Sequence, residues 1–156
     1  MKAHIERMVQ AMAWADQQVL AALRDCPAAL AEALPLFAHV VSAEHIWLTR
    51  LQRQEARHPV WPQLTLGECE GLAAENAAGY AALLGGLRDA DLGMAIHYRN
   101  TKGQEFTTSV LDILTHVVIH GAYHRGQIAK AFGRAGAPAV NTDFITFVRS
   151  VEPAIA

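Results

Sequence analysis

Cysteine is scarce in this chain, and a charge surplus and long apolar runs are absent. Cys26 and Cys69 are its two cysteines, and they stand far apart without a CxxC arrangement, which argues against a disulfide framework and indicates reduced thiols. No apolar run approaches the roughly 18 to 20 residues that span a bilayer. The net charge of −2 gives no electrostatic reason to bind nucleic acid or an anionic membrane. The polar N-terminal stretch does not look like a signal peptide, so we expect a cytoplasmic protein with neither partner.

Common catalytic motifs are missing as well. The chain has no HExxH, GxGxxG or P-loop sequence, so the zincin helix and the phosphate-binding loops are excluded. The Glu-x-x-His motif of di-iron bundles must occur on two helices, but it occurs once here, from Glu55 to His58. Arg50, Arg53 and Arg57 form a row that fits either an anion site or a solvated helix end. We favour the solvated end, because cations are favourable near a helix C-terminus.

Helical periodicity runs through almost the whole chain, whose hydrophobic fraction is 52 %. The length suits one domain, residues 1–156, with a sizeable core. The apolar spacing predicts long helices over residues 2–25, about 34–57, 66–86 and about 109–132. Residues 94–108 alternate around Thr-Lys-Gly and predict a small hairpin or an extended crossover. A short helix should follow a turn at Asn141–Asp143. The expected fold class is all-α, a four-helix bundle with its site in the core.

Three histidines in the last long helix are the most informative residues. His116, His120 and His124 are spaced by four, so neighbouring members share one helix face, and imidazole is the commonest protein ligand for zinc and nickel. The row spans about 12 Å, too far for all three to reach one ion with bonds near 2 Å. Turning by about 100° per residue places His124 nearest the apolar stripe and His116 farthest from it. The spacing favours His120 and His124 as a metal pair, with two hydrogen-bonded core-edge histidines as the alternative.

A two-histidine site needs a ligand from another helix. The second predicted helix offers His39, Glu44 and His45. Glu44 lies near its apolar stripe, His39 flanks the stripe and His45 faces nearly the opposite way. This geometry favours His39 over His45 and leaves Glu44 possible. The remaining histidines are isolated, and we expect them to be surface or hydrogen-bonded groups: His4, His58 and His97.

The same segments resemble the DinB-like family. From Thr108 to Phe147 the chain is similar to that family's H-x3-H-x3-H-R-G-Q helix, proline loop and T-D-F-I sequence. Trp14-Ala15-Asp16 resembles the W-A-N signature, with Asp in place of Asn. The residues from Leu36 to Leu51 resemble the L-x-x-H-x4-E-x2-W-L pattern. The resemblance covers essentially the whole chain.

This resemblance implies a four-helix bundle, often dimeric, that holds one divalent ion. Carried over by position, the ligands are His39, His120 and His124, the set that helix geometry also favours. His116 matches a family histidine better suited to orienting a ligand or bonding the backbone. The metal would be zinc or nickel as purified, and iron or manganese are candidates in the cell, because imidazole suits several ions and availability decides among them.

Three protein ligands leave a coordination position open, as catalytic metal sites do. An ion in such a site lowers the pKa of a bound thiol or water. The resemblance implies a thiol-dependent, S-transferase-like reaction on a small electrophile, with a low-molecular-weight thiol as partner. Metal-dependent hydrolysis is one alternative, and a non-catalytic metal-binding or interaction bundle is another. Glu44 and Asp16 are candidate general bases.

The substrate pocket should lie between the second and fourth long helices. Residues 94–108 and the Asn141–Asp143 turn are its expected rims. Tyr98 and Tyr123 are candidate hydroxyl donors, although Tyr123 is expected to pack between helices.

Two further predictions concern polar and apolar residues near the site. Successive helix residues diverge by about 100°, so Arg125 and Gln127 should point away from the metal. Arg125 would then pair with Asp143 or Asp112, and Gln127 would bond the terminal segment. Several apolar residues lie off the predicted stripes and suggest a two-fold homodimer: Val41, Ile46, Leu48, Val118 and Ile119.

Overall fold

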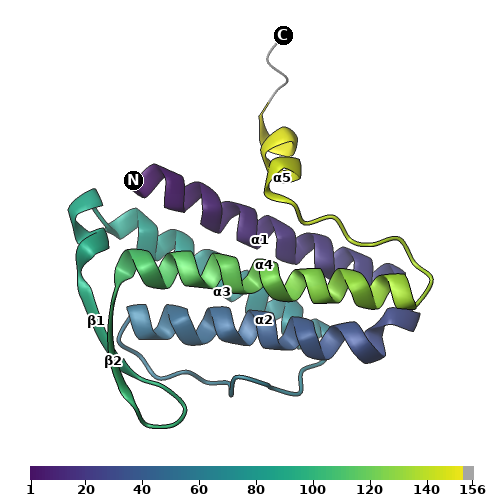
Figure 1. Cartoon of the computed structure of the whole chain (residues 1–156), viewed down its shortest axis with the longest axis horizontal. Coiled ribbons are helices and arrows are strands. Elements are labelled where there is room, and N and C mark those ends of the chain that lie inside the picture. Colours follow the sequence, from purple (N-terminus) through teal and green to yellow (C-terminus); the bar gives the residue numbers. More distant parts are fainter. Residues whose placement is uncertain (153–156) are drawn as a thin grey trace.

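The structure is a computed structural model that describes residues 1–152, so the last four residues of the predicted domain lie outside the described part. Within these residues the chain forms five α-helices, two short 3-10 helices and two strands (Figure 1). In chain order these are α1 (Lys2–Asp25), η1 (Pro27–Ala29), α2 (Leu30–Leu51), α3 (Leu66–Gly86), η2 (Asp89–Gly93), β1 (Ala95–Arg99), β2 (Glu105–Ser109), α4 (Val110–Arg134) and α5 (Phe144–Val151).

The four long helices lie lengthwise beside one another, and each contacts at least two of the others. Helix α2 packs on α4 and α3, α1 packs on α3 and α4, and α5 packs on α1. Within residues 1–152 no single helix is long and apolar enough to cross a membrane, although α1 and the following helix, bent by 105°, together meet the length and composition of a broken span.

The all-α prediction is corrected by a small sheet. Strands β1 and β2 pair antiparallel, with Ala95 opposite Ser109 and Arg99 opposite Glu105. The side chain of Asn100 accepts hydrogen bonds from the backbone N–H groups of Lys102 and Gln104 and closes the turn between the strands. Of the two interpretations of residues 94–108, the hairpin is therefore the correct one.

Local capping explains where α3 and α4 begin. Thr65 and Glu68 form a capping box: the Thr65 hydroxyl accepts from the Glu68 N–H at 3.3 Å, and the Glu68 carboxylate accepts from the Thr65 N–H at 2.7 Å. Ser109 caps α4 by accepting from the N–H of Asp112 at 3.0 Å. Such caps satisfy the backbone donors that a helix start leaves free.

Helix α2 begins and ends earlier than predicted. It starts at Leu30, where η1 leads directly into it, so Pro35 lies inside the helix. It ends at Leu51 because Arg53 adopts a φ of 58° and the N–H of Gln54 bonds the carbonyl of Thr49 at 2.8 Å. This left-handed ending is a common way to stop a helix. The segment that follows runs back beside α2 toward α3 (Figure 1).

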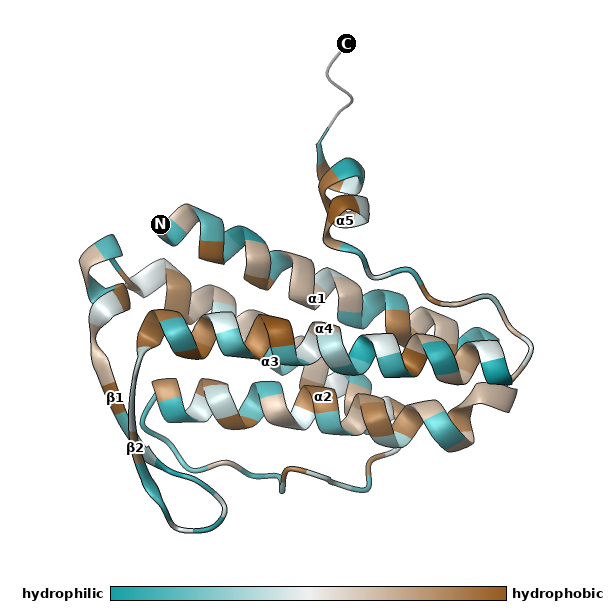
Figure 2. Cartoon of the chain, in the orientation of Figure 1, coloured by the Kyte–Doolittle hydropathy of each residue, from teal (hydrophilic) through white to brown (hydrophobic). Residues whose placement is uncertain are grey.

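The hydrophobic core consists of two clusters. One is built around Phe37, Ile128 and Phe132, the other around Met12 and Leu114. Figure 2 shows hydrophobic bands recurring along the long helices and a hydrophilic hairpin tip. On each of the four long helices, a buried polar residue lies between the residues of the two clusters, and together these form a buried polar layer: Asp16 on α1, Glu44 on α2, Asn76 on α3 and Arg125 on α4.

Candidate metal centre

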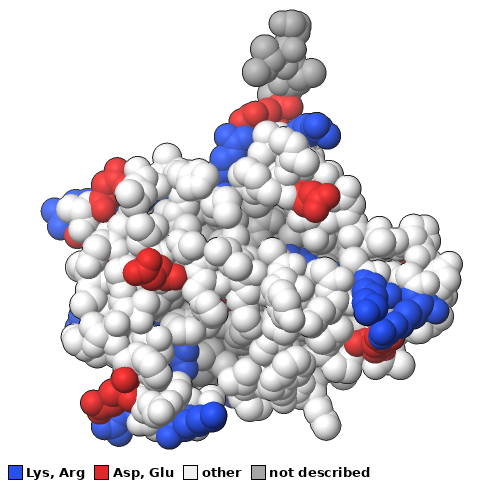
Figure 3. Space-filling model, in the orientation of Figure 1, with Lys and Arg blue, Asp and Glu red and all other residues white. Residues whose placement is uncertain are grey.

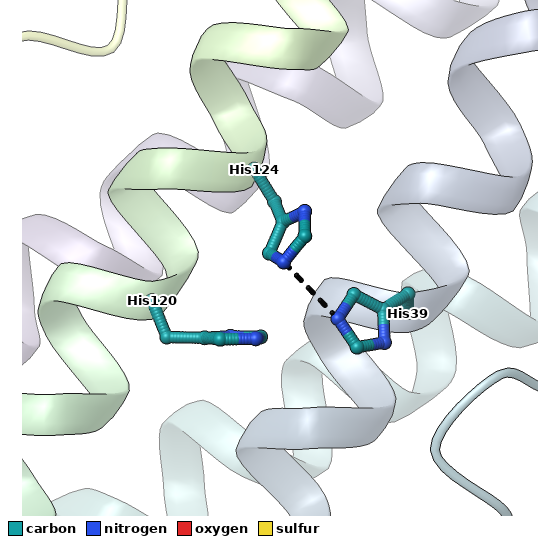
Figure 4. Close-up of side chains that lie close together, drawn as sticks. All are labelled: His39, His120 and His124. Atoms are coloured by element: carbon teal, nitrogen blue, oxygen red, sulfur yellow. Dashed lines mark hydrogen bonds between the residues drawn. The ribbon is translucent and has the colours of Figure 1, made fainter.

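Three histidines from two adjacent helices meet at one point (Figure 4). His39 comes from α2, while His120 and His124 lie one turn apart on α4. One ring nitrogen of each lies within 4.8 Å of those of the other two. We call this group the three-histidine cluster. It brings together the three residues that the sequence predicted as ligands, because α2 and α4 pack along their length.

Hydrogen bonds to the outer ring nitrogens fix the tautomers of two of these histidines. The backbone carbonyl of Val60 accepts from Nδ1 of His39 at 2.7 Å, and the Gln127 side-chain oxygen accepts from Nδ1 of His124 at 2.8 Å. Each ring therefore has its free lone pair on Nε2. The two Nε2 atoms lie 3.2 Å apart (dashed line in Figure 4). With both Nδ1 atoms protonated, the contact drawn as a hydrogen bond has no proton to share. The two lone pairs then repel each other, and a cation bound by both relieves the repulsion.

The environment of the cluster also favours neutral imidazoles. Burial, followed by the neighbouring His124 and His39, lowers the pKa of His120 to about 4. Burial lowers the pKa of His39 as well, against the opposing effect of its bond to Val60. A metal binds the neutral imidazole, so at neutral pH these two rings are ready to coordinate without first losing a proton.

The loop between α2 and α3 also contacts His39. The Ser42 hydroxyl donates to the carbonyl of Pro59 at 2.6 Å and holds this segment against α2. The Trp61 ring, 57 % exposed, stacks on His39 with centroids 3.8 Å apart and planes 7° apart. Hydrogen-bonded outer ring nitrogens and a fixed ring orientation are the usual surroundings of metal-binding histidines. The donor set and its surroundings therefore fit a divalent ion.

Over residues 1–154 the chain matches the DinB family. It belongs to that family. The chain is also similar to the protein named Protein DinB of Bacillus subtilis (strain 168), with 27 % identity over a match that covers 84 % of this chain and 86 % of the relative. The resemblance seen in the HRGQ helix is thus confirmed as family membership.

Some residues around the cluster of this DinB-family chain were missed or misplaced by sequence reasoning. Gln127 was expected to point away from the metal, and this was wrong: three residues after His124 it shares a helix face with it and bonds its ring. That spacing was a usable signal. Val60 and Trp61 gave no such signal, because only the fold of the loop after α2 brings them to His39.

His116 lies beside the cluster without joining it. Its ring stands 5.0 Å from that of Trp47 and 5.5 Å from that of His120, centroid to centroid. Burial lowers its pKa, and the nearby Arg50 adds to this effect. A histidine that supports a metal ligand would lie in contact with it, as His116 does with His120. Among the described residues, however, His116 forms no hydrogen bond to a member of the cluster.

The remaining histidines lie elsewhere. His45 accepts from the backbone N–H of Arg57 at 3.2 Å, and its ring lies near that of His58. His97 is hydrogen-bonded to Thr107 on the hairpin, and His4 is exposed on α1.

The two candidate bases, Glu44 and Asp16, belong to the buried polar layer and lie beside Arg125. Arg125 pairs with Asp16 at 2.9 Å and lies 3.7 Å from Glu44, and all three are almost fully buried. The predicted partner, Asp143 or Asp112, was therefore wrong. Asp112 instead bonds the capping Ser109. Burial raises the pKa of Glu44 well above its usual range, with the Asp16 charge adding to this and Arg125 opposing it. No carboxylate joins the three-histidine cluster within residues 1–152.

The two tyrosine candidates have different surroundings. Tyr98, on β1, packs against Trp47 with centroids 5.1 Å apart, and its hydroxyl lies 3.3 Å from that of Thr108. Tyr123 was expected to pack between helices, but it is 65 % exposed. The turn at Asn141–Asp143 begins α5, which packs on α1, so it does not line the pocket at the hairpin, which is described below.

Most of the apolar residues behind the homodimer prediction are covered by the chain itself. Ile119 is 61 % exposed, whereas four of the five are buried: Val41, Ile46, Leu48 and Val118. Because they are buried within the chain, these four are not free to form a dimer interface, and the homodimer stays a prediction.

Proposed function

We propose that this DinB-family protein binds one divalent ion through His39, His120 and His124 and uses it in a thiol-dependent transfer to a small electrophile. The observation that carries the metal site is the pair of Nε2 lone pairs 3.2 Å apart, each set by a hydrogen bond on the opposite side of its ring. The ion would be zinc or nickel as purified, with iron or manganese as candidates in the cell.

The chain's own residues support a thiol rather than water as the nucleophile. When bound, the ion would lower the pKa of a thiol and supply a thiolate at neutral pH. A thiolate attacks without a general base, whereas hydrolysis is usually assisted by one. The two candidate bases, Glu44 and Asp16, are buried beside Arg125 and away from solvent. Hydrolysis therefore ranks second.

The surroundings of the cluster would hold a small molecule in place. Trp61 stacks on His39, while His116 lies beside His120 on α4 and packs in turn against Trp47 of α2. Figure 3 shows few charged side chains at the centre of the face over α2 and α4, and more toward its margins. A largely uncharged surface of this kind suits an apolar electrophile.

The metal site is tested by metal content and affinity. His39→Ala, His120→Ala and His124→Ala should each lose the ion, because two imidazoles bind far more weakly than three. His45→Ala is the matched control, since it removes a histidine of α2 that lies outside the cluster. Full retention of metal by His124→Ala would contradict the site.

The reaction is tested with metal-loaded protein, with glutathione, bacillithiol, mycothiol and cysteine assayed against a panel of electrophiles. We expect turnover with at least one thiol and its loss in His120→Ala. Ester or amide hydrolysis that needs His120, without any thiol-dependent turnover, would replace the transferase by a hydrolase. Metal binding with neither activity would favour the non-catalytic role.

A further inference from the structure

A second group of functional side chains lies at the C-terminal end of α2, outside the three-histidine cluster. The guanidinium carbon of Arg50 lies 4.4 Å from the centre of the Trp47 ring and 4.7 Å from that of Tyr98. Its Nη2 also donates to the carbonyl of Arg99 at 3.3 Å. Aromatic faces attract a guanidinium and hold its plane, so Arg50 is fixed in one direction.

The three arginines of the row Arg50, Arg53 and Arg57 have different surroundings. Arg57 forms an ion pair with Glu75 of α3. In the described part of the chain, neither Arg50 nor Arg53 has a carboxylate within 4.0 Å. Arg50 is partly buried, and this burial lowers its pKa, which means that its charge has lost water without gaining a counter-ion. A partly desolvated cation of this kind is stabilised by an anion.

Arg50 and Arg53 line a surface pocket of about 620 Å³, a size that accepts a small molecule. Arg50, Arg53, Arg99, His58 and His97 contribute nitrogen-bearing side chains to its wall, and Glu55 is its one carboxylate among the described residues. Arg99 is paired with Glu105, so Arg50 and Arg53 supply the unpaired positive charge. The pocket lies between the end of α2, the loop after it and the hairpin.

Two chains of contacts link residues that line the pocket to the three-histidine cluster. On one side a row of rings in successive contact leads from His120 through His116 and Trp47 to Tyr98, with centroids 5.0 to 5.5 Å apart. On the other side Val60 lines the pocket and also bonds His39. Arg50 leans back over Trp47, one turn nearer the cluster. A molecule held by Arg50 would have to extend past Trp47 to reach the cluster.

We propose that Arg50 binds a carboxylate of the small molecule that occupies this pocket and reaches the three-histidine cluster. The ligand class is a carboxylate-bearing small thiol. The carboxylate site stands on Arg50 and the pocket alone, and the identification of the ligand as a thiol rests on the proposed function. Arg50 acts as a positioning residue that holds the far end of the molecule.

Binding is tested by calorimetric titration of the protein as purified with S-methylglutathione, whose blocked sulfur makes binding independent of a metal–thiolate bond. Its diethyl ester, which lacks both carboxylates, and inorganic phosphate are titrated in parallel. We expect S-methylglutathione to bind and its ester to bind far more weakly. Arg50→Met should weaken binding by roughly tenfold or more, since a hydrogen bond to a charged group is lost.

Arg57→Met is the matched control, because it removes a charge of the same row outside the pocket and should leave binding unchanged. Arg50→Lys keeps the charge without the planar fork and should retain part of the binding, which guards against a folding defect in Arg50→Met. Equal binding by wild type and Arg50→Met, equal binding of the ester, or no binding of S-methylglutathione would overturn the proposal. Binding of phosphate alone would assign the pocket to phosphate and count against the carboxylate.

The test of carboxylate binding by Arg50 and the test of the proposed function can fail independently. Metal content and thiol-dependent turnover are measured on the same preparations. Arg50-dependent binding without any turnover would support the carboxylate site and reject the transferase. Turnover that has the same KM in wild type and Arg50→Met would support the transferase and reject the carboxylate site.

Discussion

The buried layer of Asp16, Glu44 and Arg125 places two carboxyl groups against one guanidinium, without solvent. Neither oxygen of Glu44 receives a hydrogen bond. The Asp16 and Glu44 carboxyls adjoin each other, and their contact becomes a hydrogen bond only when one of them is protonated. Asn76 and Tyr80 bond backbone carbonyls of α2 instead, those of Val41 and Glu44. We therefore expect one proton to be held between the two acids.

This proton makes stability depend on pH with a definite sign. Burial raises the pKa of Glu44 well above its usual range, so the native protein keeps a proton that the unfolded chain loses above about pH 4.3. Stability then falls as pH rises from that value to the native pKa. For one proton the slope is about 1.4 kcal/mol per pH unit. Glu44→Gln resembles the protonated acid and cannot lose its proton, so it should lack this slope.

The quantity to measure is the stability difference between Glu44→Gln and wild type. Urea unfolding at pH 5, 6, 7 and 8, with a chelator present, gives this difference free of contributions from the histidines, which both proteins share. Between pH 5 and 7 it should grow in favour of the variant by roughly 3 kcal/mol while native Glu44 stays protonated. Asp16→Asn, which restores the residue of the family's W-A-N signature, should remove the slope in the same way.

The double variant is the sharpest control. With both acids changed to amides, Arg125 is left as a buried charge without a counter-ion, and unfolding should become easier by about 3 to 5 kcal/mol. A difference between Glu44→Gln and wild type that is the same at pH 5 and pH 7 would refute the shared proton.

Three further predictions concern the metal centre and its helix. Gln127→Leu should weaken metal affinity by roughly 10- to 100-fold, because His124 loses the bond that sets its tautomer, and chelator competition measures this; unchanged affinity would count against the role. Gly121→Ala should lower stability to urea by about 1 to 3 kcal/mol, since its Cβ would lie 2.8 Å from Nη1 of Arg125, whereas Gly126→Ala, which meets open space, should not. Because burial lowers the pKa of two histidines in the cluster, protons compete with metal only in more acidic solution, and dialysis should show metal retained below pH 6.5; release with a midpoint at 6.5 would contradict this.

Local sequence determined the helices and half of the metal site. Apolar spacing located α1, α3 and α4 closely, since the period of a helix and its capping residues are local properties. The same period placed His120 and His124 on one face. For α2 the local signals misled: its start and end depend on η1 and on the left-handed Arg53, neither of which apolar periodicity reveals.

Only the tertiary structure decided which groups meet across the helices. The bond from His39 to Val60, the stacking of Trp61 and the pairing of Arg125 with Asp16 join residues 21 to 109 positions apart in the chain. Helix geometry gives the direction of a side chain but not what stands opposite it. Arg125 was assigned to acids near in sequence, whereas burial required a counter-ion from α1 at the same level of the core. The sequence thus determined the ligand row on α4, and the packing of α2 and its loop against α4 determined the chemistry of that row.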